Sequence, residues 1–450
     1  MKRTLSQLAE DLSSGRTTSR TLVEECLNKI DAPNGEGSRA FVKVDRDAAL
    51  AAAVAMDELR AVRLAPSAYA GIPISVKDLF DLTGDPTPAG STVLAHSEPA
   101  VRDALAIARL RRAGFVVVGR TNMTEFAFSG VGLNPHYGTP AAPFDRATRR
   151  IPGGSSSGAG VSISDGMAYG AIGSDTGGSC RIPAALCGVV GYKPTAATIP
   201  CEGAFPLSQT LDSIGSIANS VACCRVLHYV MSGQPLTVSD SAILSGLRIG
   251  VPQAVALDDM DTHVAACFEQ ALSTLSRAGA TLRKIPFQSL VKVAHINRKG
   301  GFAAAEAYAV HRALLASAGD KYDPRVKLRI ERGRNQDCAD YIDLVRERKA
   351  FVAVLREEVS AFDVIAMPTV PIIAPPIESL EKDDDVFTRT NLLMLRNPTL
   401  INMMDGCAIS LPMHAIGQAP AGLMLAKVGG EDDRLFAIAA AVETTFAETL

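Results

Sequence analysis

The chain has 450 residues, of which 47% are hydrophobic and 21% are charged, with 45 Lys and Arg against 48 Asp and Glu. This length allows a large hydrophobic core and up to about three domains, which excludes general disorder. The net charge of -3 gives no electrostatic reason to expect nucleic acid or an anionic membrane as partner. No apolar run approaches the roughly 20 residues of a spanning helix. Glu10 and Asp11 fall where a secretory signal would be apolar, so we expect a cytoplasmic protein.

Capping residues and apolar periodicity predict helices in the N-terminal part of the chain. Thr17 and Thr18 can cap a helix that ends near Ile30. Asp45 can open an alanine-rich helix that runs toward Ala61.

From residue 71 onward, short apolar runs typical of buried strands alternate with helical patterns. We expect strands at 71–76, 115–119, 167–174, 187–192, 247–251, 280–285, 363–367, 408–413 and 421–427. We expect helices at 102–112, 219–232, 261–278, 303–317, 341–361 and 431–449. This alternation predicts an α/β protein with helices on both faces of a sheet.

No internal repeat and no long linker divides the chain, so we predict one domain over residues 1–450 with a helical N-terminal region at 1–65. The acidic run at 382–385 is typical of a solvated loop.

Sequence motifs for metals and cofactors are missing. The nine cysteines are an odd number without a C-x-x-C pair, so we predict neither a disulfide framework nor a structural zinc site. The seven histidines are scattered and form no H-E-x-x-H pattern, and no P-loop sequence occurs. We therefore expect chemistry that needs no metal and no cofactor.

One segment, residues 151–195, is unusually rich in glycine and serine. Between residues 153 and 191 it contains eleven glycines and seven serines. A flexible linker would have this composition, but linkers lack regular apolar residues such as Val161, Ile163 and Val189. Because the segment does not have the composition of a linker, its many glycines indicate tight turns and a backbone that approaches a ligand closely.

Ser179 closes the sequence Asp-Thr-Gly-Gly-Ser at 175–179. Its small neighbours leave several backbone N–H groups able to converge on one point. Acyl transfer through a serine nucleophile needs such donors for the tetrahedral oxygen. A Gly-Gly-Ser sequence also occurs in ordinary loops. The hypothesis that Ser179 is a nucleophile therefore also requires a residue that can act as its base.

The base that accepts the proton of this serine could be either a histidine or a lysine. Residues 154–158 match the G-x-S-x-G turn of His-dependent α/β-hydrolases, but such a match is expected by chance in a Gly/Ser-rich segment. His228 and His311 fall in helical patterns, and no histidine is flanked by a loop with suitable partners. Lys77 ends the apolar run 71–76, and burial there would favour its neutral form. Periodicity alone favours a strand-end lysine that extends to water.

Several blocks of the sequence together resemble the amidase signature family. They are GIPISVKDLF (71–80), GRTNMTEFAFSG (119–130), PGGSSSGAG (152–160), GSDTGGSCRIPAALCGVVGYKPT (173–195), DVIAMPTVPIIAPP (363–376) and NPTLINMMDGCAISLP (397–412). The resemblance extends from about residue 5 to residue 449. It implies the amidase-signature fold, which is a large twisted mixed β-sheet covered by helices on both faces, with a catalytic core at about 66–215.

The resemblance implies a Ser–cis-Ser–Lys triad in which Ser179 is the nucleophile, Ser155 the cis-serine and Lys77 the base. The two serines are 24 residues apart, as the family pattern expects. A proton relay through two hydroxyls would explain why no histidine is required. The implied oxyanion hole consists of backbone N–H groups of Thr176, Gly177 and Gly178 and can include Ser179. The implied supporting residues are Ser156, Asp175 and Arg181.

The resemblance also implies a small-molecule amide substrate, whose C–N bond is hydrolysed next to pocket residues Phe128, Ser129 and Gly130. No cluster of basic residues stands out near these motifs, so we do not expect a strongly anionic substrate. Two alternatives stay open. One is a hydrolase of carbamates, ureas or activated esters with the same triad, and the other is the A subunit of a glutamyl-tRNA amidotransferase. We expect neither nucleic acid nor a membrane as partner, and both a monomer and a homodimer fit the resemblance.

Overall fold

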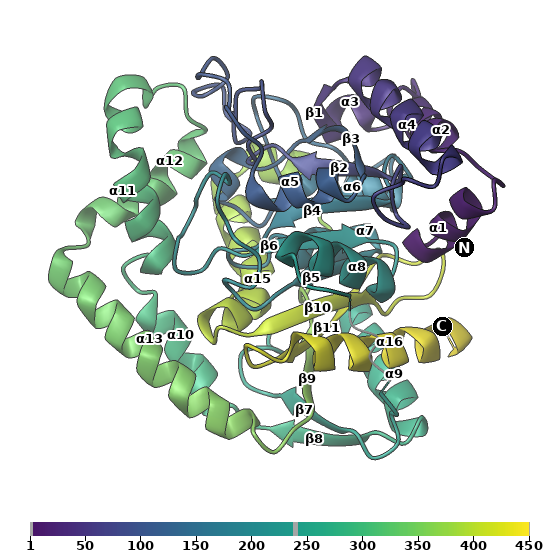
Figure 1. Ribbon diagram of the computed structural model, residues 1–450. Coiled ribbons are helices and arrows are strands. Elements are labelled where there is room, and N and C mark those ends of the chain that lie inside the picture. Colours follow the sequence, from purple (N-terminus) through teal and green to yellow (C-terminus); the bar gives the residue numbers. More distant parts are fainter. Residues whose placement is uncertain (1–2, 237–241, 450) are drawn as a thin grey trace.

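The computed structural model describes residues 3–236 and 242–449. Their central feature is one mixed sheet with the strand order β1-β3-β2-β4-β6-β5-β10-β11-β9-β7-β8 (Figure 1). The strands are β1 (Phe41–Val44), β2 (Pro73–Lys77), β3 (Val116–Thr121), β4 (Gly170–Ser174), β5 (Val190–Lys193), β6 (Ile214–Ala218), β7 (Arg248–Pro252), β8 (Thr281–Ile285), β9 (Val364–Pro368), β10 (Cys407–Pro412) and β11 (Gly422–Lys427).

Helices surround this sheet. They are α1 (Leu5–Ser13), α2 (Ser19–Ile30), α3 (Gly37–Ala40), α4 (Arg46–Ala61), α5 (Leu105–Arg112), α6 (Ser157–Ser164), α7 (Arg181–Cys187), α8 (Val221–Ser232), α9 (Thr262–Arg277), α10 (Lys292–Ile296), α11 (Gly301–Ala318), α12 (Pro324–Glu331), α13 (Cys338–Val359), α14 (Ile377–Lys382), α15 (Asp384–Met403) and α16 (Asp432–Thr449). Short 3-10 helices are η1 (Glu125–Ala127), η2 (Gln288–Val291) and η3 (Arg332–Asn335). No helix in the described ranges combines the length and apolar character needed to cross a membrane.

The sheet contains both parallel and antiparallel pairs. β2 pairs in parallel with β3 and β4, and β7 pairs in parallel with β8 and β9. Between these groups, β6 is antiparallel to β4 and β5, and β10 is antiparallel to β5 and β11. Every residue of β2, β4, β5, β6 and β9 is buried, as expected for strands covered on both faces. The α/β fold predicted from the sequence is confirmed.

Successive residues of a strand point to opposite faces of the sheet, and helices cover both of these faces. On β4, Ile172 belongs to a core cluster that includes side chains of α5, α8 and α16. Its neighbour Ala171 belongs to a second cluster with α2, α6 and α7. Helices α11, α12 and α13 lie together at one side of the molecule, on the left in Figure 1.

Local sequence signals account for the helix starts that were predicted. The Thr18 hydroxyl accepts a hydrogen bond from the backbone N–H of Thr21 at 3.1 Å and caps α2. The Asp45 carboxylate accepts one from the N–H of Ala48 at 3.2 Å and caps α4.

A strand or helix occurs close to each predicted position, but the sequence did not predict β1, β6, α6, α7, α10, α12, α14 or α15. β6 has the sequence IGSIA, whose glycine and alanine have low strand propensity, and it forms because β4 and β5 pair with both of its edges. β1 is only four residues long and lies within the N-terminal region predicted to be helical.

The prediction of a loop at 382–385 is wrong. Lys382 ends α14, and Asp383 caps α15, because its carboxylate accepts hydrogen bonds from the N–H groups of Asp385 and Val386 at 2.9 Å each. The acidic side chains that follow lie at the N-terminus of α15, where the helix dipole stabilises negative charge. Composition alone does not distinguish this arrangement from a solvated loop.

Candidate active site

Two neighbouring parallel strands, β2 and β4, end at the same edge of the sheet beside the predicted catalytic residues. Lys77 is the last residue of β2, and Ser174 is the last residue of β4. The strands pair in register, with Val76 opposite Ile172. The turn that contains Ser179 follows β4 and therefore starts next to Lys77 at the end of β2, although the two are about 100 residues apart in the sequence. The segment with Ser155 comes from the chain between β3 and α6.

Lys77 lies fully inside the protein, so the alternative of a lysine that extends to solvent is wrong. Its Nζ donates hydrogen bonds to Ser155 Oγ at 2.7 Å and to Ser174 Oγ at 2.8 Å. Burial lowers the pKa of Lys77 to about 8, a shift that nearby acidic groups partly oppose. The ammonium therefore loses its proton more readily than that of an exposed lysine.

Ser155 follows a cis peptide bond, which joins it to Gly154. Its carbonyl accepts a hydrogen bond from the N–H of Thr124 at 3.0 Å, and the N–H of Gly154 donates to the carbonyl of Gly130 at 2.8 Å. These bonds attach the serine segment to the loop that follows β3. Ser156 then precedes α6, and its hydroxyl donates to the carbonyl of Ser174 at 3.4 Å.

Ser179 lies in the turn between β4 and α7 and is 4% exposed. The N–H of Ser156 donates to the carbonyl of Ser179 at 3.4 Å, so the two serine segments run side by side. Within the described chain, the hydroxyls of Ser155 and Ser179 share no hydrogen bond. The structure therefore brings Lys77 and Ser155 into direct contact and places Ser179 in the adjacent segment.

A buried ion pair holds this turn. Asp175 and Arg181 are both fully buried, and the guanidinium donates to both carboxylate oxygens, at 2.8 and 3.0 Å. The carboxylate also accepts the N–H groups of Gly178 at 2.8 Å and Cys180 at 3.1 Å. Burial alone would raise the pKa of Asp175, but the Arg181 charge outweighs it and holds the pKa well below its usual range.

The predicted oxyanion donors differ in availability. The N–H of Gly178 is already bonded to Asp175, so it is not free for a ligand. The N–H groups of Thr176, Gly177 and Ser179 donate to no group among the described residues. Gly178 has φ +126° and a Cβ there would lie 2.5 Å from Pro398 Cβ, so the turn requires glycine at this position.

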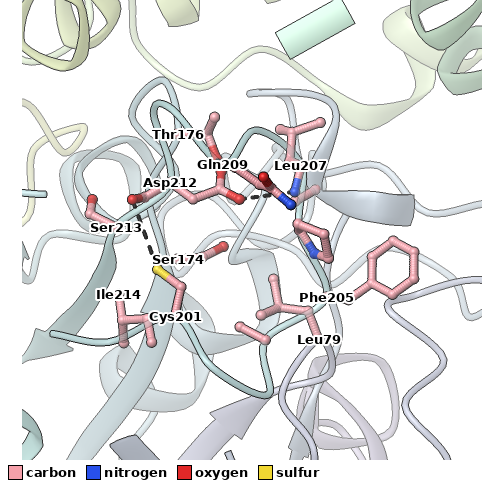
Figure 2. Close-up of a pocket in the computed structure, with 13 residues that line it drawn as sticks. Leu79, Ser174, Thr176, Cys201, Phe205, Leu207, Gln209, Asp212, Ser213 and Ile214 are labelled. Atoms are coloured by element: carbon pink, nitrogen blue, oxygen red, sulfur yellow. Dashed lines mark hydrogen bonds between the residues drawn. The ribbon is translucent and has the colours of Figure 1, made fainter. Parts of the chain in front are cut away.

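A cavity of about 260 Å³ opens beside this turn (Figure 2). Ser174, which accepts the hydrogen bond from Lys77, and Thr176 belong to its wall. The rest of the wall is mainly apolar and consists of Leu79, Ala127, Cys201, Ala204, Phe205, Pro206, Leu207, Gln209, Asp212, Ser213 and Ile214.

Asp212 is a polar residue of the cavity that the sequence reasoning missed. Its carboxylate accepts hydrogen bonds from Thr176 Oγ1 at 2.5 Å and from the N–H groups of Leu207 and Ser208 at 3.0 Å each. Burial raises the pKa of Asp212 to about 6, although these hydrogen bonds oppose the shift. No motif marks this residue, because a single Asp before a strand is common.

The predicted pocket residues Phe128, Ser129 and Gly130 lie next to Ala127 but are not part of the cavity wall. Ser129 Oγ and the N–H of Gly130 both donate to Asn391 Oδ1, at 3.0 and 2.8 Å. This segment is therefore held by α15, far away in the sequence. His228 and His311 lie buried in α8 and α11, and no group of three possible metal ligands occurs among the described residues.

Comparison with known proteins shows the family of the chain. A family model described as Amidase matches residues 21–436. The chain is 33% identical over 445 residues to 2-amino-5-chloromuconic acid deaminase of Comamonas testosteroni, which covers 98% of this chain and 95% of that protein. It is also 33% identical over 457 residues to the A subunit of the glutamyl-tRNA(Gln) amidotransferase of Chloroflexus aggregans, with 94% and 92% covered. A crystal structure of an amidase superposes with a TM-score of 0.89 and 29% identity, over 98% of this chain and 99% of that one. The chain therefore belongs to the Amidase family and is an enzyme that hydrolyses an amide C–N bond, as its motifs predict.

Proposed function

We propose that the enzyme hydrolyses a small carboxylic amide through a Ser179 acyl-enzyme, with Ser155 and Lys77 as the proton relay. The observation that carries this proposal is the 2.7 Å hydrogen bond from the buried Lys77 Nζ to Ser155 Oγ. Because burial lowers the pKa of Lys77 to about 8, a fraction of this lysine is neutral near neutral pH and can accept a proton.

The reaction proceeds by two attacks on the same carbonyl carbon. Ser179 Oγ attacks first and passes its proton to Ser155, which passes its own proton to Lys77. The C–N bond then breaks as the proton returns by this path to the leaving nitrogen, and the amine departs. Water next attacks the ester bond to Ser179, and the same relay restores the serine as the carboxylic acid leaves.

The oxyanion formed in both attacks needs preorganised donors. The free N–H groups of Thr176, Gly177 and Ser179 support this role. Asp175 and Arg181 act as positioning residues, because their contacts orient the turn that carries these donors. Ser156 supports the same turn through its bond to the Ser179 carbonyl.

The size of the cavity supports a small substrate. Its volume of about 260 Å³ is slightly below the roughly 300–1,000 Å³ that is usual for ligand sites. A relative of similar length is named for a small molecule, 2-amino-5-chloromuconic acid. Carbamates, ureas and activated esters would react through the same relay and are distinguished from amides by a substrate panel.

The similarity to the A chain of an amidotransferase favours a second candidate function. In that case the same residues would release ammonia from an amide for use by a companion protein. Hydrolysis of small amides by the purified chain alone supports the first candidate, whereas activity that depends on a companion protein supports the second.

The test is a set of variants assayed on purified protein with amides, carbamates, ureas and p-nitroanilides, by release of amine or ammonia. Ser179→Ala should abolish turnover, and Lys77→Ala should reduce it by about 10²- to 10⁴-fold, because the relay loses its nucleophile or its base. Ser317→Ala removes an exposed hydroxyl near the C-terminal end of α11 and should have no effect. Activity of Ser179→Ala equal to that of the wild type would refute the proposal.

A further inference from the structure

The loop that precedes β6 runs alongside the turn that carries the candidate nucleophile. The antiparallel pairing of β4 with β6 continues beyond the strands through the pair Asp175 and Ser213. The N–H of Asp175 donates to the carbonyl of Ser213 at 2.8 Å, and the N–H and hydroxyl of Ser213 donate to the Asp175 carbonyl at 3.2 and 2.8 Å. In this register the next residue of the turn, Thr176, lies opposite Asp212.

Asp212 connects two segments of the cavity wall. Its Oδ1 accepts the hydroxyl of Thr176 at 2.5 Å, and its Oδ2 accepts the N–H groups of Leu207 and Ser208 at 3.0 Å each (Figure 2). Thr176, Leu207 and Asp212 all line the cavity. One carboxylate therefore ties the loop before β6 to the first residue of the predicted oxyanion hole.

Thr176 is held by its side chain rather than by its own N–H. That N–H donates to no group among the described residues, and neither does the N–H of Gly177. The next N–H of the turn, on Gly178, is fixed by Asp175 instead. The hydroxyl bond to Asp212 is therefore the contact that orients Thr176 and the peptide group that follows it.

The loop has a second anchor, which does not involve Thr176. Glu306 of α11 accepts hydrogen bonds from Ser208 Oγ at 2.5 Å and from the hydroxyl of Tyr341, on α13, at 2.7 Å. We expect the loop to stay attached to these helices when the Asp212 carboxylate is removed, so that the loss falls on Thr176.

We propose that Asp212 is a positioning residue of the oxyanion hole, whose carboxylate fixes Thr176 so that the N–H groups of Thr176 and Gly177 meet the oxyanion. This inference rests on the proposed function, because the oxyanion arises when Ser179 attacks the substrate carbonyl. In this role Asp212 acts through Thr176 and takes no part in the proton relay. Its contribution is to the transition state, since the bound amide does not yet carry the full negative charge.

The experiment compares three variants on the amide or p-nitroanilide that the wild type hydrolyses fastest. Asp212→Ala should lower kcat about 10- to 100-fold and leave KM nearly unchanged, because a misplaced donor weakens mainly the transition state. Asp212→Asn should retain most of kcat, because its oxygen accepts the two N–H groups and its NH₂ donates to the Thr176 hydroxyl. Thr176→Val keeps the shape of the side chain without the hydroxyl and should match Asp212→Ala.

The double variant tests whether Asp212 acts through Thr176. Asp212→Ala combined with Thr176→Val should be no slower than either single variant, because both remove the same contact. Asp103→Ala is the matched control. Asp103 accepts the hydroxyl of Thr83 at 3.0 Å and is not part of the cavity wall, so its loss should leave kcat unchanged. Thermal unfolding of every variant shows whether it is folded, and Thr176→Val decides if Asp212→Ala is not.

Three results would each overturn the inference while leaving the role of Ser179 intact. Thr176→Val has the kcat of the wild type, Asp212→Asn is as slow as Asp212→Ala, or the two single losses multiply in the double variant.

Labelling by phenylmethanesulfonyl fluoride separates the inference from the proposed amide substrate. Ser179 Oγ bonds to sulfur, the S–F bond breaks, fluoride leaves and the serine proton passes to the relay. The oxyanion hole receives a sulfonyl oxygen, so Asp212→Ala and Thr176→Val should slow labelling, as followed by mass spectrometry of the Ser179 peptide. If no amide is hydrolysed but both variants slow labelling, the proposed function fails and the positioning role stands. Equal labelling rates in wild type and variants, or no labelling of Ser179, overturn the inference.

Discussion

At the scale of single residues, the candidate site depends on polar groups that sit at the ends of apolar strands. Lys77 follows four buried residues of β2, so the strand that builds the core also carries an amine into it. A buried amine has a lowered pKa only while it lacks a strong acidic partner, and its direct partners here are the neutral hydroxyls of Ser155 and Ser174. The same arrangement with a carboxylate contact would keep the lysine protonated.

This state of Lys77 predicts the pH dependence of the reaction. Below about pH 8 the ammonium form dominates and cannot accept a proton, so kcat/KM should fall about tenfold per pH unit on the acidic side. Above that pH the amine is neutral and the rate should level off. The measurement is a profile of kcat/KM between about pH 6 and pH 9, with thermal unfolding followed over the same range as a control for folding. A rate that does not change across this range would contradict the role of Lys77 as the base.

Individual residues also divide into those that the sequence predicted and those that it could not. Lys77, Ser155 and Ser179 are recognisable because they stand in contiguous blocks with family-like spacing. Asp212 stands in no such block, and it is recognised only because it lines the cavity and bonds to Thr176. A sequence pattern reports neighbours along the chain, and these contacts are made across it.

At the scale of elements, the turn between β4 and α7 carries the candidate nucleophile and is held from both sides. Its own Asp175 accepts two backbone N–H groups of the turn, and Asn402 of α15 donates to the same carboxylate at 3.0 Å. Arg181, at the start of α7, completes the pair. The geometry of the turn is thus shared between a strand, two helices and one buried ion pair.

Removal of one partner tests this arrangement. Asp175→Asn keeps the shape of the side chain but leaves the Arg181 charge buried and uncompensated, which should cost about 3–5 kcal/mol of unfolding free energy. Asp343→Asn breaks an exposed pair with Arg346, and there the cost should be only about 0–1 kcal/mol. Denaturant titration of both variants measures the difference. Equal costs for the two variants would show that the buried pair does not hold the turn.

Elements were predicted well where the pattern was regular and less well where neighbours determine the structure. The apolar runs that became β2, β3 and β9 have the composition of buried strands in any context. β6 and the long helix α15, which has Pro398 in its interior, do not have such a signal. They form because adjacent strands and the turn at 175–180 pack against them.

At the scale of the whole molecule, one sheet connects the ends of the chain. β1, from the N-terminal part, pairs with β3, and β10 and β11, from the C-terminal part, join β5 to β9. Near the C-terminus, Glu443 of α16 accepts the N–H of Val221, which starts α8. Strands from residue 41 to residue 427 therefore belong to one hydrogen-bonded sheet.

This connectivity predicts that the chain unfolds as one unit, in line with the single domain expected from the sequence. Circular dichroism, which reports helices, and near-ultraviolet signals of tyrosine, which report tertiary packing, should give the same denaturant midpoint. Chains of this length often unfold in steps, so coincidence of the two curves is informative. A separate early transition of residues 1–65 would contradict the prediction and would indicate a second folding unit.

The sequence by itself predicted the α/β class, most strands, the family and, through the resemblance to that family, the three residues of the candidate relay. These follow from local periodicity and from side chains grouped in short blocks, which need no knowledge of distant contacts. Only the tertiary structure decided that Lys77 is buried against Ser155, that the N–H of Gly178 is occupied, and that Asn391 of α15 holds segment 128–130. Burial and hydrogen-bond satisfaction are properties of the packed chain, because they depend on which distant groups exclude water from a side chain and which leave it unpaired.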